Sequence, residues 1–315
     1  MTPLPSAPTS RRHWLTLNAA SVALAGLSAL PAFAAQPATA PAVSYFSSPS
    51  SATAPQAIPM TNLKAQVAAL LKSIETGDSA PVAFINPRKY IQHNLAVADG
   101  LAGFGAVLQA LPKGSAKVNT VRVFQDGPYV FTHTDYDFFG PKIGFDIFRF
   151  EDGHIVEHWD NLQEKPAQPN PSGRTMIDGP TVATDLDKTA ANKALVQAFV
   201  DDILVNGRMD KLAGYFDGDH YIQHNPQVAD QVSGLGAALQ AMAQAGVTMT
   251  YSRVHQVLGE GNFVLSVSEG SFAGKHVAFY DLFRVQNGKI AEHWDVIETI
   301  APPAERKNTN GKFGF

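Results

Sequence analysis

Two short sequence patterns carry histidines or carboxylates beside aromatic residues, and each pattern occurs twice in the chain. Residues 90–94 (Tyr-Ile-Gln-His-Asn) recur at 221–225. Residues 145–160 recur at 280–295 with nine of sixteen positions identical, among them two aspartates, a glutamate, a histidine and a tryptophan. Histidine titrates near neutral pH, and a carboxylate in apolar surroundings has a raised pKa. These residue types therefore indicate proton transfer.

The longer pattern contains a turn signal that predicts which of its side chains share a face. Asp152-Gly153 and Asn287-Gly288 are typical of two-residue type I′ turns, in which both positions need a positive φ. Counting outward from the first turn pairs Asp146 with Trp159, and paired residues point to the same side of a sheet. We therefore expect one face to carry Asp146, Glu157 and Trp159 in the first copy, and Asp281, Phe283, Glu292 and Trp294 in the second.

Two carboxylates on one otherwise apolar face form a candidate acid–base site, because each raises the pKa of the other. Purely structural interpretations of these carboxylates stay open. Glu157 and Glu292 could lie at a solvated rim and pair with a cation, and Asp146 and Asp281 could make structural hydrogen bonds. The opposite face is expected to hold an ion-pair cluster that serves either catalysis or a contact between domains: Arg149, His158 and Asp160, with Arg284, His293 and Asp295.

The elements that position these patterns follow one order in both copies. A helix is expected first, over 62–75 and 189–206, and another over 104–110 and 235–245. Four β-runs complete each copy, at 117–124, 129–136, 142–150 and 154–163, and at 248–257, 263–272, 275–285 and 289–300. Helices followed by a sheet of hairpins predict an α+β fold with the helices on one face. A repeat of this length predicts a duplicated domain.

The repeated patterns resemble the SnoaL-like polyketide cyclases of the NTF2-like superfamily, over residues 60–165 and 187–302. The resemblance rests on Tyr-Ile-Gln-His-Asn, on Asp-(Ile/Leu)-Phe-Arg and on (Asp/Asn)-Gly-x-Ile-x-Glu-His-Trp-Asp. It implies two tandem cone-shaped domains, in each of which helices pack on a strongly curved, mostly antiparallel sheet around an apolar pocket. It also implies that the two copies pair through their sheets as an internal pseudo-dimer.

The same resemblance suggests roles for the repeated polar residues. Asp146 and Asp281 look like the pocket aspartate that ketosteroid isomerase keeps protonated to bind an enolate oxygen. His93 and His224, or the asparagines that follow them, fall near the position of that enzyme's general base; each histidine is equally explained as a structural residue. The predicted catalytic residues are His93, Asp146, His224 and Asp281, and the predicted substrate-binding residues are Asn94, Glu157, Trp159, Asn225, Phe283, Glu292 and Trp294.

Composition excludes several other function classes. The 315 residues include 24 Lys and Arg against 28 Asp and Glu, and this balance provides no basic surface for nucleic acid. The chain has no cysteine, which excludes disulfides, thiolate metal sites and cysteine nucleophiles. Neither a metal nor a cofactor is predicted.

The N-terminal segment predicts export. Arg11 and Arg12 precede an apolar run that ends in Ala32-Phe33-Ala34, so residues 1–35 resemble a twin-arginine signal peptide. A membrane anchor is the alternative, but the run is short and rich in small residues. We expect a periplasmic or secreted protein with no membrane association after cleavage. Residues 36–59 are predicted to be a disordered tether, 166–186 a linker and 303–315 a tail.

These features together predict a cofactor-independent enzyme. It would do enolate-type acid–base chemistry, such as aldol condensation, cyclisation or isomerisation, on a small apolar carbonyl compound. His93 or His224 would move the proton, and Asp146 or Asp281 would bind the developing oxyanion. The alternative is a non-catalytic protein that binds a small hydrophobic ligand in the same kind of pocket.

Overall fold

The computed structural model describes residues 63–111 and 114–315, so the predicted signal peptide and tether lie outside the described residues. The first half consists of α1 (Leu63–Thr76), η2 (Ala80–Phe84), β1 (Ile91–Gln92), α2 (Gly100–Ala110), β2 (Lys117–Asp126), β3 (Tyr129–Asp137), β4 (Pro141–Glu151) and β5 (His154–Glu164). We use "first half" for residues 63–165 and "second half" for residues 187–302.

The second half repeats this order of elements. It consists of α3 (Thr189–Phe199), η4 (Val200–Val205), η5 (Met209–Tyr215), β6 (Ile222–Gln223), α4 (Val232–Gln244), β7 (Met249–Glu260), β8 (Phe263–Phe272), β9 (Lys275–Gln286) and β10 (Lys289–Thr299). The short η3 (Leu186–Lys188) precedes it and η6 (Pro303–Glu305) follows it. The predicted helices and β-runs are all present, with ends that differ by a few residues.

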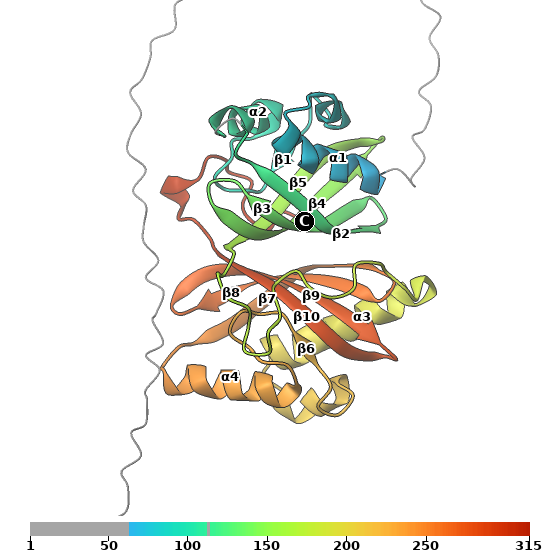
Figure 1. The fold of residues 1–315 in the computed structure, drawn as a ribbon, viewed down its shortest axis with the longest axis vertical. Helices are drawn as coiled ribbons and strands as arrows, with labels where there is room; N and C mark the ends of the chain where they lie inside the picture. The colour runs from blue at the N-terminus through green and yellow to red at the C-terminus, as the bar shows by residue number, and fades with distance from the viewer. Residues whose placement is uncertain (1–62, 112–113) are drawn as a thin grey trace, which may run out of the picture. The chain divides into compact units, whose positions relative to one another are not determined.

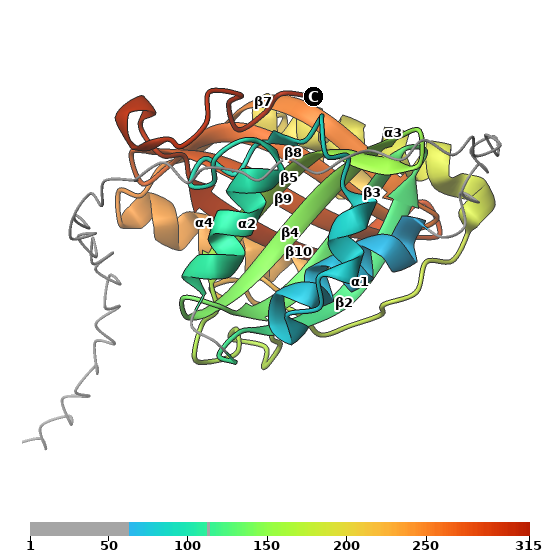
Figure 2. The ribbon, with the colours of Figure 1, turned by 90° about the horizontal axis from the view of Figure 1, so that it is seen from above.

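Each half contains one five-stranded sheet. The strand orders are β1-β5-β4-β3-β2 and β6-β10-β9-β8-β7, in which only the short first strand of each half runs parallel to its neighbour. In each half the helices lie on one face of the sheet (Figure 1), and Figure 2 shows α1 and α2 lying across the first sheet. The predicted α+β architecture is confirmed.

Helix α1 shows why the helices dock on the sheets. Its buried apolar residues are Leu63, Val67, Leu70 and Leu71, whose spacing of three and four residues places them on one helix face. The helix ends before Gly77, which has a φ of +71° and so adopts the left-handed conformation common after helices. The buried stripe packs with Val118, Phe148 and Ile155 of the sheet in one hydrophobic cluster.

The register of the β4–β5 hairpin differs from the predicted one. The turn is as expected, because Asp152 and Gly153 have φ values of 48° and 76°. Glu151 then pairs with His154, and Phe150 pairs with Ile155. After these two pairs a β-bulge leaves Val156 unpaired, so that the next residues in register are Arg149 and Glu157. An extra residue on one strand shifts the pairing by one and turns every later side chain of that strand to the other face.

The bulge makes the predicted face assignment wrong. Asp146 pairs with Asp160, and Phe148 pairs with His158, so these four side chains share one face. Glu157 and Trp159 lie on the opposite face. The second half has the same bulge between Ile290 and Glu292. Glu292 and Trp294 are therefore also turned away from Asp281, whereas Phe283 shares the face of Asp281 as expected.

The face that carries Trp159 packs on the other sheet. One hydrophobic cluster contains side chains of both sheets, including Trp159, Phe131, Phe263 and Trp294. Asn161 of β5 is fully buried, and its Nδ2 donates to the carbonyl oxygens of Ala278 at 3.1 Å and Val296 at 2.7 Å. The helix-covered face of each sheet has its own separate cluster.

The linker and the tail each fold onto the half that they do not follow. Nδ2 of Asn170 in the linker donates to the carbonyl oxygens of Gln223 and Val228 in the second half. Nδ2 of Asn308 in the tail donates to the carbonyl oxygens of Asn94 and Val97 in the first half. The linker, which follows the first half, thus binds the second half, and the tail, which follows the second half, binds the first. Of the described helices, none combines the length and the apolar character needed to cross a membrane.

Candidate active site

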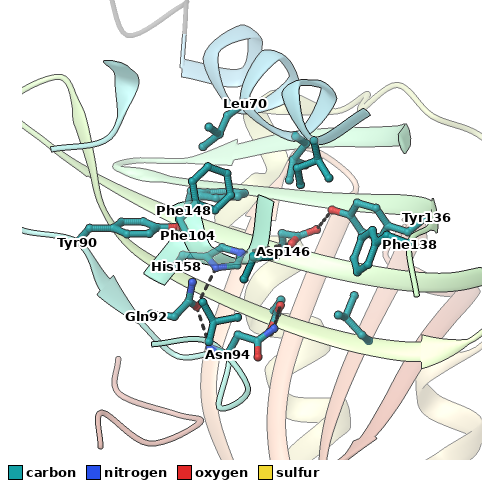
Figure 3. A pocket seen from close by; sticks show the side chains of 16 residues that line it. Leu70, Tyr90, Gln92, Asn94, Phe104, Tyr136, Phe138, Asp146, Phe148 and His158 are labelled. Atoms are coloured by element: carbon teal, nitrogen blue, oxygen red, sulfur yellow. Dashed lines mark hydrogen bonds and ion pairs between the residues drawn. The ribbon is translucent and has the colours of Figure 1, made fainter. Parts of the chain in front are cut away.

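A cavity of about 90 Å³ lies between the helices and the sheet of the first half. Apolar side chains form most of its wall, and a few polar groups converge on one side (Figure 3). The apolar lining comes from α1, α2, β4, β5 and the loops after β1 and β3: Leu70, Leu71, Ile74, Val97, Phe104, Val107, Phe138, Phe148 and Leu162. The polar lining consists of Tyr90, Gln92, Asn94, Tyr136, Asp146, His158 and Asp160. An apolar pocket with a few converging polar groups is the usual form of a small-molecule site.

Asp146 is the centre of the polar side of this cavity. It is buried, and its Oδ2 accepts hydrogen bonds from the hydroxyl of Tyr136 at 2.6 Å and the hydroxyl of Thr132 at 3.2 Å. Its Oδ1 lies 3.3 Å from Nε2 of His158. Burial and the charge of Asp146 raise the pKa of Tyr136 well above its usual value, so the Tyr136 hydroxyl stays a hydrogen-bond donor.

Gln92 decides which nitrogen of His158 carries a hydrogen. The Oε1 of Gln92 accepts the backbone N–H of Asn94 at 2.8 Å, which identifies this atom as the amide oxygen. The same oxygen lies 2.9 Å from Nδ1 of His158, so Nδ1 must carry a hydrogen. In the neutral imidazole, Nε2 then presents a lone pair to the carboxylate of Asp146. Two acceptors at that distance need a shared proton or a cation between them.

Asp160 lies beside this pair. Nδ2 of Asn94 donates to its Oδ2 at 2.6 Å, whereas its Oδ1 has no hydrogen-bond donor among the described residues. The nearest cation is Lys312 of the tail, whose Nζ lies 3.8 Å from Oδ1. Burial and the charges of Asp160 and Asp146 raise the pKa of the neighbouring Tyr90. The donor atoms of Asp146, His158 and Asp160 lie within 4.8 Å of one another, as a metal ion would require.

The second half repeats most of this arrangement. Nε2 of His293 lies 3.0 Å from Oδ1 of Asp281, and Nδ1 of His293 lies 2.9 Å from Oε1 of Gln223. Asn225 donates to Oδ2 of Asp295 at 2.7 Å. Burial raises the pKa of Asp295; the charge of His293 opposes this shift and that of Asp281 adds to it. Asp281, His293 and Asp295 again place three donor atoms within 4.8 Å.

The tyrosine that contacts the aspartate comes from different strands in the two halves. In the first half Tyr136 of β3 pairs with Val118 of β2. In the second half the aromatic residue is Tyr251 of β7, and its partner on β8 is Gly270. The Tyr251 hydroxyl lies 3.2 Å and 3.3 Å from the two oxygens of Asp281. The tyrosine and the small residue have exchanged places across the strand pair, and the contact with the aspartate persists.

The predicted histidines lie on the other face of the sheet. Nε2 of His93 lies 3.0 Å from Oε1 of Glu157, its Nδ1 lies 2.7 Å from the carbonyl oxygen of Gly311, and its ring stacks on Trp159 at 4.7 Å. Arg149 makes a 2.6 Å ion pair with Glu157. Burial disfavours the charge of Glu157, but its hydrogen bonds to His93 and Arg149 outweigh that effect and lower its pKa. Glu157 thus pairs with a cation, as one of the interpretations had it, but it is buried and does not lie at a solvated rim.

The second half has the same cluster on that face. Nε2 of His224 lies 2.9 Å from Oε1 of Glu292, and its ring stacks on Trp294 at 4.6 Å. Nδ1 of His224 lies 2.7 Å from the carbonyl oxygen of Thr175 in the linker. The expectation that these histidines, glutamates and tryptophans share a pocket with the aspartates is therefore wrong. Asn94 lines the cavity, as expected for a substrate-binding residue.

Several residues of the site were missed or were assigned to the wrong face. Gln92 and Gln223 belong to the repeated pentapeptide. His158 and Asp160, which share a face, belong to the repeated His-Trp-Asp unit. Recurrence in both copies was thus a usable signal for the glutamine, the histidine and the aspartate. Tyr136 carried no such signal, because Tyr251 does not align with it.

Residues 196–293, less than a third of the chain, match the model of the SnoaL-like domain. Among curated proteins, no sequence matches the chain. The chain is similar to solved structures that each cover about a third of it.

One such structure is a candidate ketosteroid isomerase from Kribbella flavida, with 16% identity over 37% of this chain and 84% of that one, at a TM-score of 0.30. Another is a LEH-like epoxide hydrolase from M. tuberculosis, with 20% identity over 35% and 85%, at a TM-score of 0.27. A third is a SnoaL-like polyketide cyclase from Agrobacterium tumefaciens, with 12% identity over 34% and 91%, at a TM-score of 0.27.

Proposed function

We propose that the first half is an enzyme that transfers protons to and from a small apolar carbonyl compound. One observation carries the proposal: Nε2 of His158 faces Oδ1 of Asp146 at 3.3 Å on the wall of an otherwise apolar cavity. Because Gln92 holds the hydrogen on Nδ1, a single proton is shared between Nε2 and the carboxylate. A buried acid–base pair beside an apolar cavity is suited to enolate chemistry.

The proposed reaction uses the state in which the shared proton lies on Asp146. Nε2 of His158 then takes the proton from the carbon next to the substrate carbonyl. The negative charge that develops on the carbonyl oxygen is stabilised by the carboxyl hydrogen of Asp146, whose Oδ2 accepts the hydroxyl hydrogen of Tyr136. Return of the proton from Nε2 to another carbon completes an isomerisation. In an aldol reaction the enolate carbon attacks a second carbonyl, and the proton on Nε2 passes to the alkoxide oxygen that forms. His158 thus replaces His93 as the proposed base.

The test is proton exchange at the carbon next to the carbonyl of simple apolar ketones. The ketone is incubated in D₂O with the mature protein, and deuterium incorporation is followed by NMR. Asp146→Asn and His158→Gln should lower the exchange rate by about 10²–10⁴-fold, the usual contribution of an acid–base group. His154→Gln and Asp187→Asn make the same changes outside the cavity and should leave the rate unchanged. Equal rates in all four folded variants would rule out the proposed roles.

A second candidate function is binding without catalysis, and one observation favours it. Both oxygens of Asp146 already have partners within the protein, in Tyr136, Thr132 and His158. In this case an apolar ketone would raise the melting temperature without any exchange, and Asp146→Asn would leave that rise intact. Loss of both exchange and thermal stabilisation on Leu70→Trp, which fills the cavity, would assign the effect to this pocket.

We also propose that the protein is exported by the twin-arginine route and acts in the periplasm or outside the cell. Arg11 and Arg12 and the Ala32-Phe33-Ala34 pattern support this proposal. Changing both arginines to lysine should keep the precursor in the cytoplasm, and mass spectrometry of the exported protein should give a mature N-terminus near residue 35. Export of the lysine variant at the normal level would exclude this route.

We further propose that the two halves arose by duplication and form a pseudo-dimer. Their identical strand order supports this proposal, as does the hydrophobic cluster that draws on both sheets. Chains 63–186 and 187–315, produced separately and mixed, should then associate. If both chains folded but remained monomeric after mixing, the contact between the two halves would not act as a dimer interface.

A further inference from the structure

We propose that Asp281, His293 and Asp295 of the second half bind one divalent transition-metal ion. One imidazole and two carboxylates are a donor set suited to Zn²⁺, Mn²⁺, Fe²⁺ or Co²⁺. This site is separate from the acid–base pair proposed for the first half, so either proposal can fail without the other.

Two of the donor atoms already lie at the spacing that a metal ion imposes, and the third lies close to them. Nε2 of His293 and Oδ1 of Asp281 are 3.0 Å apart, and the three donor atoms lie within 4.8 Å of one another. Two ligands at ~2.0–2.2 Å from one ion are separated by about 3.0–3.5 Å in octahedral or tetrahedral geometry. All three residues are buried, so that water competes weakly for the ion.

The groups behind the donors orient them as in known metal sites. Oε1 of Gln223 accepts the backbone N–H groups of His224 at 2.9 Å and Asn225 at 3.0 Å, and it lies 2.9 Å from Nδ1 of His293. The hydrogen of His293 is therefore held on Nδ1, and the lone pair of Nε2 is directed toward Asp281. A metal-ligating histidine almost always donates its other N–H in this way. Asn225 holds Oδ2 of Asp295.

A buried carboxylate oxygen lacks a partner at this site. Asp295 is 7% exposed, and no hydrogen-bond donor among the described residues reaches its Oδ1. Within residues 63–111 and 114–315, no lysine or arginine forms an ion pair with Asp281 or Asp295, and His293 is the sole basic side chain in contact with them. An unpaired buried carboxylate is unfavourable. A bound cation would satisfy both the free oxygen and the excess negative charge.

The first half shows what replaces the ion where it is not needed. It has the same three residue types, Asp146, His158 and Asp160, but the ammonium of Lys312 lies 3.8 Å from Oδ1 of Asp160. Lys312 is 4–5% exposed and also binds Glu298 at 2.6 Å. The linker covers the second half as the tail covers the first. Its basic residue Arg174 forms an ion pair with Asp230 and not with Asp281 or Asp295. The second half therefore has an uncompensated cluster, and the first half does not.

The test uses the whole mature chain, freed of metal by dialysis against a chelator and titrated with Zn²⁺, Mn²⁺ and Co²⁺ in a calorimeter. We expect one ion per chain for at least one of these metals, and an absorption band of bound Co²⁺. Asp281→Asn with Asp295→Asn should weaken binding by at least about 100-fold, because two of three ligands lose their charge. Asp160→Asn, the matched change in the first half, should leave one ion per chain. Circular dichroism of the metal-free variants checks that each one folds.

Lys312→Met sharpens the test by removing the competing ammonium from the first half. We expect this variant to bind two ions per chain. Three results would each overturn the proposal: no binding of any of the three metals, binding that survives the double substitution, or a loss on Asp160→Asn equal to that of the double substitution. A stoichiometry that stays at one in Lys312→Met would refute the role given to Lys312.

Discussion

The amide oxygen of Gln92 lies 2.9 Å from Nδ1 of His158 and so determines that Nε2 faces Asp146. Gln92 is the middle residue of the repeated pentapeptide, and Gln223 makes the same contact with His293. The pentapeptide thus contributes to the pocket through its glutamine, while its histidine faces the other way. A side chain that only orients a base can matter as much as a residue in the reaction, because the wrong tautomer offers no lone pair to the substrate.

Replacing Gln92 by leucine should therefore impair His158 without removing it. Loss of the acceptor lets the hydrogen move to Nε2, and we expect the exchange rate of the ketone to fall by about 10–100-fold. Nitrogen-15 NMR should show the change of tautomer directly. Gln66→Leu is the matched control, because Gln66 is also buried and its Oε1 has no hydrogen-bond partner among the described residues. If Gln92→Leu kept the Nδ1–H tautomer, the orienting role would be excluded.

Gly270 should not tolerate a side chain. A Cβ there would lie 1.9 Å from the carbonyl oxygen of Thr250 and 3.0 Å from the ring of Phe279, on which Tyr251 stacks at 4.0 Å. We expect Gly270→Ala to lower the free energy of unfolding by about 2–4 kcal/mol through strain in a packed sheet. Gly214 has no heavy atom within 4 Å of such a Cβ, so Gly214→Ala should change stability by less than about 1 kcal/mol. Urea denaturation measures both, and equal effects would contradict the packing argument.

His133 should make the protein less stable in mild acid. Burial and the charge of Arg122 lower the pKa of His133 well below its usual value, and Nη1 of Arg122 lies 3.1 Å from Nδ1, which must therefore be the acceptor. In the unfolded chain His133 takes up a proton below about pH 6.5. Since the folded state does not take up that proton, stability falls as the pH drops from 7 to 5, by up to about 1.4 kcal/mol per pH unit.

His133→Gln removes this titration and keeps an acceptor for Arg122. Urea midpoints measured from pH 7 to pH 5 should decline less steeply for the variant than for the parent protein. His154→Gln, which removes a half-buried histidine beside the β4–β5 turn, should leave the slope of the parent unchanged. Parallel slopes for His133→Gln and the parent would contradict the assignment of a depressed pKa.

The tail and the linker should contribute similarly to stability. Asn308→Ala removes two hydrogen bonds to the first half, and Asn170→Ala removes two to the second. We expect each change to cost about 1–3 kcal/mol, because buried carbonyl groups lose their donors. Asn119→Ala, which changes an exposed residue, serves as the control. It should cost less than about 1 kcal/mol of stability, as substitutions on the surface usually do.

Phe315 offers an optical readout for the same segment. Its ring stacks on Trp159 at 4.5 Å, so loosening of the tail should change the tryptophan emission before global unfolding. Asn308→Ala should show this early change and Asn170→Ala should not. A single transition shared by both variants would mean that the tail does not detach on its own.

The local elements of this protein could be predicted from the sequence. The apolar spacing in 62–75 predicted a helix, observed as α1 over Leu63–Thr76, and Asp152-Gly153 predicted a turn with positive φ at both positions. These features depend on residues a few positions apart, and therefore local patterns suffice. Asp146 lines the cavity, as its resemblance to a pocket aspartate implied, and the recurrent segments 90–94 and 145–160 contribute other residues of the lining.

The partners of Asp146 could not be predicted in this way. The bulge at Val156 lies where the neighbour of β5 changes from Ile85, which bridges to Ile155, to Ile91, which pairs with Glu157. Those contacts come from residues more than sixty positions away. Pairing residues outward from the turn considers only the hairpin itself and therefore could not include them. The sequence by itself determined the elements and the residue types of the site. The tertiary structure alone decided that His158 rather than His93 faces Asp146, because one unpaired residue reverses the faces of a strand.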